Sequence, residues 1–515
     1  MTDKELICQL IMIDISHQEL NCDFKNSYKE TPWGGIILFA KNIKDEHQLK
    51  KLNKDLKELS LQVTPELPIL IGSDHEGGIV TRFNFDSISP LCGNMALGAA
   101  NNPFYTETSA QICGNDLINL GFNVNFAPVV DINSNPLNPI IGARSFGESP
   151  KLVADMAESY IKGSQKCGML TCAKHFPGHG DVSLDSHLTM PLIEKTLEEL
   201  ESCEIIPFKR CIENGVDMVM TSHIAFTALE HDPSIPATLS KNILTDYLRG
   251  KLDFDGVIIT DSMSMKGIRN YFGYEKAAVM AFKAGADIVM LCGNEEEKLN
   301  AVQAIAEAIQ TGELDRLELE KSYKRVSKLR KKVFSKKSYE LPSDTIKILK
   351  QMTAKSITVV KNESNIIPLK TNNLLLIQPE FIPPSPQGEA VISLTLESFL
   401  QQKNNKVNTI TYAFKTGKID KKELISKVNL ADILIFCVYA NGRMAEKQIE
   451  LADKLKPYKN KLIAVSLSSP YILRDMPWVT SYINCYNHGP ISMESLAEII
   501  TGEKLPFGVS PVTTI

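Results

Sequence analysis

This sequence has few tryptophans, no long apolar runs and little excess of one charge. Its 515 residues include two tryptophans and 7% aromatic side chains, and its formal charge is −5 with a pI near 6.1. A nearly balanced charge gives no reason to expect nucleic acid or an anionic membrane surface as a partner. No run reaches the roughly 18 apolar residues of a membrane span. We therefore expect no nucleic acid and no membrane among the partners.

Cysteine pairs are also missing. None of the eleven cysteines forms a CxxC pair, their number is odd, and several, such as Cys172 and Cys437, lie in apolar runs. This pattern is typical of reduced, buried thiols. The N-terminus lacks the basic start, long apolar core and small-residue cleavage site of a signal peptide. The expected location is the cytoplasm.

The length is too great for one ordinary domain of roughly 100–200 residues. At 43% hydrophobic and 23% charged, the composition is typical of a soluble globular protein.

One pattern recurs through the first half: a short apolar run ends in a polar residue, and a longer amphipathic stretch follows. Such runs predict parallel strands buried on both faces. The eight runs are Gln9–Ile15, Gly35–Phe39, Ile69–Asp74, Asn123–Asp131, Met169–His175, Asp217–His223, Gly256–Asp261 and Asp287–Gly293.

Eight strands alternating with helices predict an α/β fold, a (β/α)8 TIM barrel. A doubly wound open sheet is the alternative. The strand count, and the absence of a GxGxxG after the first strand, favour the barrel. A basic stretch at 315–337 is expected to be a solvated helix face leading to a linker, because it lacks the interleaved aromatics that would favour nucleic acid.

The remainder of the chain also alternates strand-like and helix-like segments. We therefore predict a barrel domain at 1–338 and a smaller αβα sandwich domain at 339–515. The expected strands lie in Ser356–Asn362, Asn373–Pro379, Asn408–Phe414, Asp432–Ala440, Lys461–Tyr471 and Ser481–Asn487.

The polar residues that end the barrel strands are the strongest sign of function. Catalytic groups of such barrels lie at the carboxyl ends of the strands. Five successive runs deliver polar groups to that rim: Asp74, Asp131, Lys174 with His175, His223 and Asp261. Any one of them alone is explained by a cap or a turn, but all five together indicate an active site.

The segment from Ala173 to Pro191 carries three of the nine histidines, His175, His179 and His187. Asp185 and His187 stand two residues apart, so in an extended segment they point to the same side. A carboxylate that accepts from an imidazole fixes its tautomer and raises its pKa, which suits a general acid and base near neutral pH.

A metal site is the alternative for this cluster. Five side chains have ligand chemistry, but the tight spacing of an HExxH helix is missing, and the first strand lacks an HxH. We expect no metal and no cofactor. The five candidate ligands are His175, His179, Asp181, Asp185 and His187.

Together these segments resemble glycoside hydrolase family 3, in its bacterial β-N-acetylglucosaminidase branch. The most specific motif is Lys-His-Phe-Pro-Gly-His-Gly at 174–180, followed by Asp-Ser-His at 185–187. Four other segments agree, and a looser likeness extends over the C-terminal part. The four are Ser73–Phe83, Phe126–Gly147, Met220–Ile224 and Gly256–Met265.

The resemblance implies a role for each matching residue. Asp261 would be the nucleophile that forms a covalent glycosyl-enzyme, His187 the acid/base and Asp185 the group that orients His187. For Asp131 and His223 a structural role is an equal alternative. The residues implied to bind the sugar are Asp74, Arg144, Lys174, His175, Asp131 and His223.

The resemblance also implies the activity. It is that of a retaining exo-β-N-acetylglucosaminidase (a β-N-acetylhexosaminidase) that acts on N-acetylglucosaminides, among them muropeptides in peptidoglycan recycling, as a monomer or homodimer. A phosphorylase is a close alternative, because a neutral His repels phosphate less than a carboxylate does. A metal-dependent hydrolase and a non-catalytic sugar-binding protein are others. The chain departs from the family pattern at His75, Ile79 and Val182, and none of these is an expected catalytic group.

Overall fold

The computed structural model describes residues 1–183, 190–335, 344–382 and 394–514. The chain forms two compact units: one of residues 1–75, 107–132 and 157–341, and another of residues 76–106, 133–156 and 342–515. The sequence pattern did not predict that the second unit takes two segments from early in the chain. The expected boundary between 338 and 339 falls outside the described residues and stays a prediction.

Eight parallel strands in the order β10-β1-β2-β3-β4-β5-β7-β9 form the core of the first unit. The two edge strands of this sheet are β9 and β10. A parallel bridge between Ile259 of β9 and Ile288, just before β10, brings these edges together and nearly closes the barrel. The predicted barrel is confirmed, and each of the eight apolar runs overlaps one strand, with β5 extending one residue beyond its run. They are β1 (Ile11–Asp14), β2 (Gly35–Ile37), β3 (Leu70–Ser73), β4 (Val124–Asn125), β5 (Leu170–Phe176), β7 (Met218–Thr221), β9 (Val257–Ile259) and β10 (Val289–Leu291).

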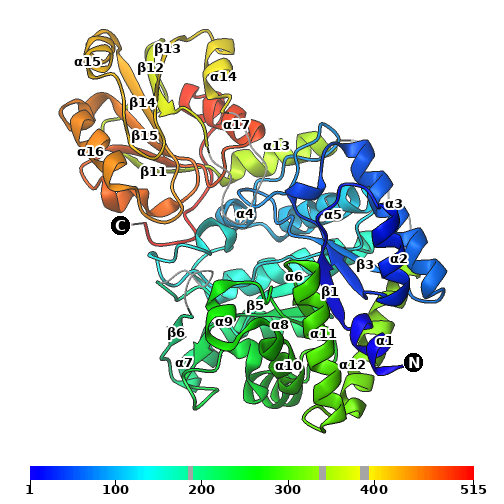
Figure 1. Ribbon diagram of the computed structural model, residues 1–515. Coiled ribbons are helices and arrows are strands. Elements are labelled where there is room, and N and C mark those ends of the chain that lie inside the picture. Colours follow the sequence, from blue (N-terminus) through cyan, green and yellow to red (C-terminus); the bar gives the residue numbers. More distant parts are fainter. Residues whose placement is uncertain (184–189, 336–343, 383–393, 515) are drawn as a thin grey trace. The chain divides into compact units, whose positions relative to one another are not determined.

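Helices surround this barrel (Figure 1). They form where apolar residues recur every three or four positions, as Leu49, Leu52, Leu56 and Leu59 do on the buried face of α3, which Asp45 caps by accepting from the backbone N–H of Gln48. The helices are α1 (Asp3–Gln9), α2 (Cys22–Glu30), α3 (Glu46–Val63), α5 (Pro103–Asn119), α6 (Pro150–Cys167), α7 (Leu197–Ser202), α8 (Ile205–Glu213), α9 (Lys266–Phe272), α10 (Tyr274–Ala284), α11 (Glu295–Gln310), α12 (Arg316–Lys332) and the π-helix η4 (Asn242–Lys251).

One side of the basic stretch on α12 is bound to the barrel, whereas Lys324, Lys328 and Lys331 are exposed, so the expected solvated face makes up only part of the helix. Arg330 is fully buried, and its guanidinium donates to the backbone carbonyls of Leu67 and Pro68. Arg325 donates to buried Asp287 at 2.9 Å, and Lys332 lies 2.7 Å from Asp217. Several of its charges are therefore neutralised inside the unit, which the charge pattern alone did not reveal.

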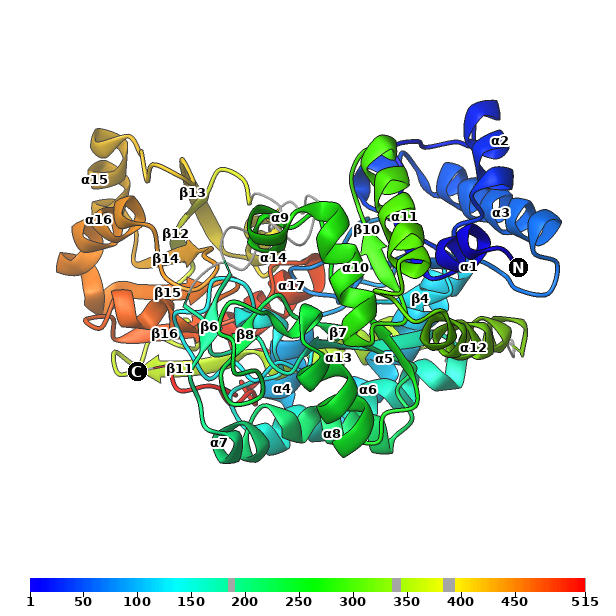
Figure 2. The ribbon, with the colours of Figure 1, turned by 60° about the horizontal axis from the view of Figure 1, so that its bottom comes forward.

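The second unit is built on a six-stranded sheet in the order β11-β16-β15-β14-β12-β13, parallel except for the β11–β16 pair. Each face carries its own apolar core: α15 and α16 pack on one, α14 and α17 on the other, as Figure 2 shows for α15 and α16. The predicted αβα sandwich is confirmed. The strands are β11 (Thr358–Asn362), β12 (Asn373–Pro379), β13 (Lys406–Tyr412), β14 (Ile433–Val438), β15 (Leu462–Ser466) and β16 (Ser481–Asn484).

The sandwich helices are α14 (Leu396–Gln402), α15 (Lys421–Leu430), α16 (Glu446–Leu455) and α17 (Pro490–Thr501), and the unit also contains α4 (Asn94–Ala100) and α13 (Thr345–Ser356). Two short strands apart from the barrel, β6 (Leu192–Ile193) and β8 (Ala225–Phe226), pair in parallel. The 3₁₀ turns are η1 (Ala40–Asn42), η2 (Gly142–Arg144), η3 (Ala237–Leu239), η5 (Val333–Ser335), η6 (Lys456–Lys461) and η7 (Pro470–Asp475).

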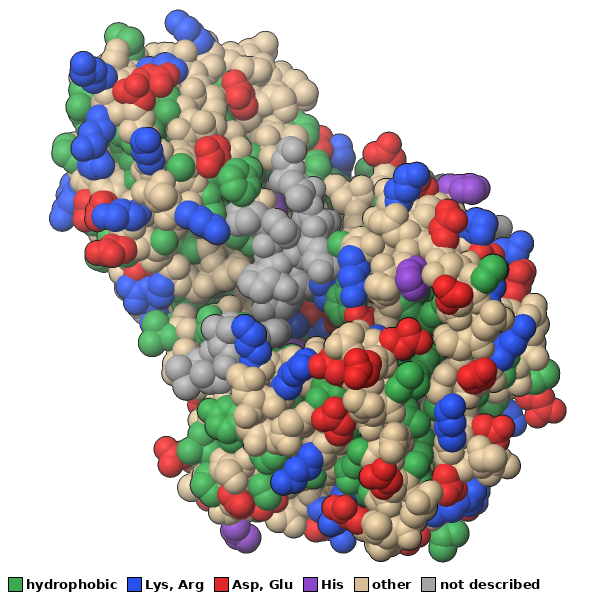
Figure 3. All heavy atoms as spheres, in the orientation of Figure 1, with side chains coloured by type: hydrophobic (Ala, Val, Ile, Leu, Met, Phe, Trp, Pro, Cys, Tyr) green, Lys and Arg blue, Asp and Glu red, His purple; other side chains and the backbone are tan. Residues whose placement is uncertain are grey.

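In the described ranges, no helix has both the length and the apolar character needed to cross a membrane. On the face of the first unit in Figure 3, acidic and basic side chains are interspersed. That distribution differs from the basic patch or stripe of a nucleic-acid-binding protein.

Candidate active site

The carboxyl ends of the barrel strands bring most of the predicted site residues to one rim. Because all eight strands are parallel, residues that follow different strands lie at the same end of the barrel. All five predicted strand ends have this placement in the first unit: Asp74 after β3, Asp131 after β4, Lys174 and His175 at the end of β5, His223 after β7 and Asp261 after β9.

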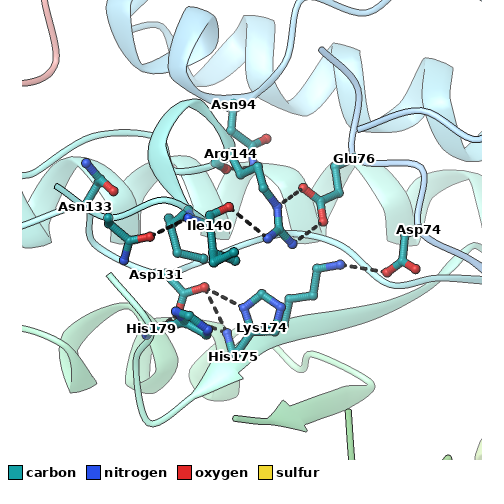
Figure 4. Close-up of polar contacts among 12 residues, drawn as sticks. Asp74, Glu76, Asn94, Asp131, Asn133, Ile140, Arg144, Lys174, His175 and His179 are labelled. Carbon is teal, nitrogen blue, oxygen red and sulfur yellow. Dashed lines mark hydrogen bonds and ion pairs between the residues drawn. The ribbon is translucent and has the colours of Figure 1, made fainter. Parts of the chain in front are cut away.

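Lys174 and Asp74 form an ion pair on this rim. The Lys174 ammonium lies 2.9 Å from an Asp74 carboxylate oxygen, and Figure 4 shows the two side chains meeting from neighbouring parts of the barrel. The Lys174 side chain is almost completely buried, whereas 17% of the Asp74 side chain is exposed. The pair therefore presents its carboxylate, a good hydrogen-bond acceptor for hydroxyl groups, to the solvent side.

Asp131 is fully buried and is a hydrogen-bond acceptor for three N–H groups of the motif loop. It lies 2.7 Å from Nδ1 of His175, and it accepts from the backbone N–H of His175 at 3.1 Å and of His179 at 2.7 Å (Figure 4). Burial would raise the pKa of Asp131, but the charge of His175 and its hydrogen bonds outweigh burial and hold the pKa below its ordinary value. As a carboxylate only accepts, His175 carries its proton on Nδ1 and directs Nε2 away from Asp131.

His223 has protein partners for both ring nitrogens. Nδ1 lies 2.9 Å from the hydroxyl of Thr238, and Nε2 lies 3.1 Å from the backbone carbonyl of Ser262, the residue after Asp261. Only 1% of His223 is exposed.

Asp261 is partly exposed at the end of β9. One of its carboxylate oxygens accepts from the backbone N–H of Ser262 at 2.7 Å. A side chain at this position has the chemistry of a nucleophile, because a carboxylate oxygen can attack an anomeric carbon.

Arg144 belongs to the second unit and forms a buried, two-pronged ion pair with Glu76. The distances are 3.0 Å from Nε to one Glu76 oxygen and 2.8 Å from Nη2 to the other, and Nη1 donates to the carbonyl of Ile140 at 3.2 Å. Figure 4 draws these contacts. The sequence analysis missed Glu76 as a partner of Arg144, although Glu76 lies in Ser73–Phe83, one of the segments that carry the family resemblance.

Asp185 and His187, the predicted acid/base pair, lie at 184–189, outside the described residues. Within the parts of the chain that the structure describes, no group of three or more His, Cys, Asp or Glu side chains has the arrangement of a metal site. The alternative cluster of five ligands includes the same two undescribed residues.

Acidic groups and imidazoles gather at the carboxyl ends of the barrel strands, where enzymes with a (β/α)8 barrel carry their active sites. Fold and site together therefore define the class of protein as a (β/α)8-barrel enzyme. Residues 2–329 match the glycosyl hydrolase family 3 N terminal domain. As this match covers more than half of the chain, the chain belongs to glycosyl hydrolase family 3.

Two curated relatives are similar to this chain in sequence. The chain is 34% identical over 365 residues to β-hexosaminidase A of Pseudoalteromonas piscicida. That alignment covers 66% of this chain and 61% of the relative. It is 35% identical over 314 residues to the β-hexosaminidase of Chromobacterium violaceum, in an alignment that covers 60% of this chain and 85% of the relative. The chain thus spans less than two thirds of the length of the first of these relatives.

Solved structures agree over the whole chain. A glycoside hydrolase family 3 β-N-acetylglucosaminidase from Paenibacillus sp. str. FPU-7 is similar with a TM-score of 0.93 and 31% identity, covering 100% of this chain and 99% of the other. A β-glucoside phosphorylase is similar with a TM-score of 0.85 at 22% identity, which shows the common fold alone.

Proposed function

We propose that this protein is an exo-acting β-N-acetylglucosaminidase that works with retention through a covalent glycosyl-enzyme. The observation that carries the proposal is Asp261, a partly exposed carboxylate at the end of β9, on the rim that also carries the Lys174–Asp74 pair and His175. The β-hexosaminidases of similar sequence support the choice of an N-acetylhexosamine as the sugar.

In the first step, a carboxylate oxygen of Asp261 attacks the anomeric carbon of the sugar. The bond from that carbon to the aglycone oxygen breaks, and its electron pair stays on the oxygen. His187 donates a proton to this oxygen, so that the aglycone leaves as an alcohol. Asp185 orients the imidazole and stabilises its protonated form.

In the second step, His187 takes a proton from a water molecule, whose oxygen then bonds to the anomeric carbon. The bond to Asp261 breaks, and its electron pair returns to the carboxylate. Two inversions at one carbon retain the β configuration. Both steps need a proton acceptor and donor near neutral pH, which suits an imidazole paired with an acidic group.

Sugar binding is assigned to Asp74, Lys174, His175 and Arg144. The first three lie on the barrel rim, and a carboxylate, an ammonium and an imidazole suit hydroxyl and acetamido groups through charge-assisted hydrogen bonds. For Arg144, the family motif at 126–147 is the support. We propose that Asp131, whose carboxylate accepts three N–H groups of the motif loop, contributes indirectly by orienting His175.

The physiological substrate we propose is the N-acetylglucosamine end of muropeptides, cleaved in the cytoplasm during peptidoglycan recycling. All eleven cysteines are free, which supports a reducing compartment. A monomer or a homodimer is compatible with an exo-acting enzyme.

Trapping with a 5-fluoro N-acetylglucosaminide, followed by peptide mapping, tests the nucleophile. The expected result is a labelled peptide that contains Asp261, with hydrolysis of p-nitrophenyl β-N-acetylglucosaminide but not of the β-glucoside. Label on another residue, or equal rates on the two substrates, contradicts the proposal. The same assay in phosphate buffer identifies the acceptor, because a phosphorylase releases the sugar 1-phosphate whereas a hydrolase releases the free sugar.

A further inference from the structure

The peptide unit between Ser262 and Met263, one residue beyond Asp261, is held by groups from two neighbouring strands. The backbone carbonyl of Ser262 lies 3.1 Å from Nε2 of His223, and the backbone N–H of Met263 donates to the carbonyl of Met290 at 3.0 Å. The carbonyl and the N–H of this one peptide unit are thus fixed from β7 on one side and from β10 on the other. The backbone N–H of Ser262 in turn donates to the Asp261 carboxylate at 2.7 Å.

His223 is itself fixed by hydroxyl groups. A carbonyl only accepts, so Nε2 of His223 carries a proton and donates it to Ser262. Nδ1 faces the hydroxyl of Thr238 at 2.9 Å, and Thr238 lies 2.8 Å from the hydroxyl of Thr221. With 1% of the residue exposed and both nitrogens bonded inside the protein, the imidazole has its hydrogen-bonding groups committed before any sugar arrives.

We propose that His223 is a positioning residue for the nucleophile, not a ligand of the sugar. It holds the Ser262 carbonyl, which fixes the backbone from which the Ser262 N–H reaches the Asp261 carboxylate. The inference deepens the proposed function, since it takes Asp261 as the nucleophile. A nucleophile that shifts by about 1 Å loses up to roughly a hundredfold in rate without any loss of sugar affinity.

Three variants separate the hydrogen bond from the shape of the side chain. His223→Phe keeps a ring of similar size but lacks the N–H. His223→Gln offers an amide N–H with a reach similar to that of Nε2. Thr238→Val removes the hydroxyl that faces Nδ1 while preserving the size of residue 238. Thr245→Val is the matched control, because the Thr245 hydroxyl donates to the carbonyl of Ala284 at 2.8 Å among the helices outside the barrel.

The measurement is the rate of covalent labelling by the 5-fluoro N-acetylglucosaminide at saturation, together with the inhibition constant of N-acetylglucosamine. We expect His223→Phe to label roughly tenfold to a hundredfold more slowly than wild type, with an inhibition constant within about twofold. His223→Gln should regain most of the rate, Thr238→Val should lose part of it, and Thr245→Val should match wild type.

Two results would overturn the proposal. One is a saturating labelling rate in His223→Phe equal to that of wild type. The other is weakened N-acetylglucosamine inhibition with an unchanged saturating rate, as expected for a sugar ligand. If His223→Phe does not fold, Thr238→Val decides the question by the same two measurements. A wild-type enzyme that is not labelled on Asp261 would instead refute the proposed function.

Discussion

The ammonium of Lys195 lies 2.7 Å from a carboxylate oxygen of Asp181, so the two flanks of the segment 182–194 are joined by an ion pair. The same ammonium lies 2.5 Å from Glu204, whose side chain is buried and packs against Gly178. A Cβ at Gly178 would lie 2.8 Å from Cγ of Glu204, and Gly178 has φ +145°, so glycine is required there. Lys195 thus links the motif loop to the start of α8.

Lys195→Met should impair the acid/base step selectively. The variant loses the ion pair that joins the flanks of the segment containing His187, so protonation of the leaving oxygen should suffer most. We expect kcat/KM to fall roughly tenfold to a hundredfold for an alkyl or sugar aglycone, which needs the proton. The 2,4-dinitrophenyl glycoside, which leaves without a proton, should change much less.

A series of leaving groups of different pKa measures this effect as a steeper dependence of rate on leaving-group pKa. Lys251→Met is the control, because Lys251 pairs with Glu201 on the exposed surface. An equal loss on every leaving group would contradict the assignment of Lys195 to this step.

Glu76→Gln should destabilise the second unit. The substitution removes the negative charge of Glu76 from its buried ion pair with Arg144, and breaking a buried ion pair costs about 3 kcal/mol of unfolding free energy. Guanidinium unfolding of wild type and variant measures the loss. Glu58→Gln, which removes an exposed pair with Lys54, should change stability by less than about 0.5 kcal/mol. If the two substitutions lowered the unfolding free energy equally, the buried Arg144–Glu76 pair would not stabilise the second unit as predicted.

Asp131→Asn should lower stability at neutral pH, because one of its two acceptor oxygens becomes an NH₂ group that faces other donors. Hydrogen bonds to a charged group are worth about 1.5–3 kcal/mol, and we expect a loss in this range. The pKa of Asp131 lies below its ordinary value, so this stabilisation is present above pH 4 and disappears as the pH falls through the folded-state pKa. Unfolding at pH 7 and at progressively lower pH should therefore show the two proteins converging in acid. A constant difference would argue against an ionised Asp131.

His488 should make the protein less stable in mild acid. It is 5% exposed, its ring meets Tyr439 edge-on with centroids 5.4 Å apart, and burial lowers its pKa to about 4. Between about pH 6.5 and pH 4, the unfolded chain binds a proton that the folded chain excludes, so this residue's contribution is complete above pH 6.5 and declines below it. The expected decline is about 1.5 kcal/mol between pH 6.5 and pH 5.

His488→Phe should flatten this dependence when urea midpoints are compared at pH 7 and pH 5. His231→Asn, at an exposed position, should keep the wild-type slope. An unchanged slope in His488→Phe would assign the acid sensitivity to other groups.

Part of the site followed from the sequence because parallel strands obey a simple rule. A continuous apolar run marks a strand buried on both faces, and the residue that ends it must lie on the rim. Asp74, Asp131, Lys174, His175, His223 and Asp261 were placed in this way, and each follows or ends its strand as expected. Asp185 and His187 rest on motif resemblance, because they lie outside the described residues.

The local sequence determined the eight barrel strands, the sandwich and the family, since each depends on patterns within a few residues. Only the tertiary structure decided what the rim side chains contact. Asp131 meets His175, His223 meets Ser262, and Arg144 meets Glu76, all partners distant in the chain. Likewise, the second unit takes residues 76–106 and 133–156. The physical reason is that a hydrogen bond requires two groups within about 3 Å, and folding alone sets which distant groups come that close.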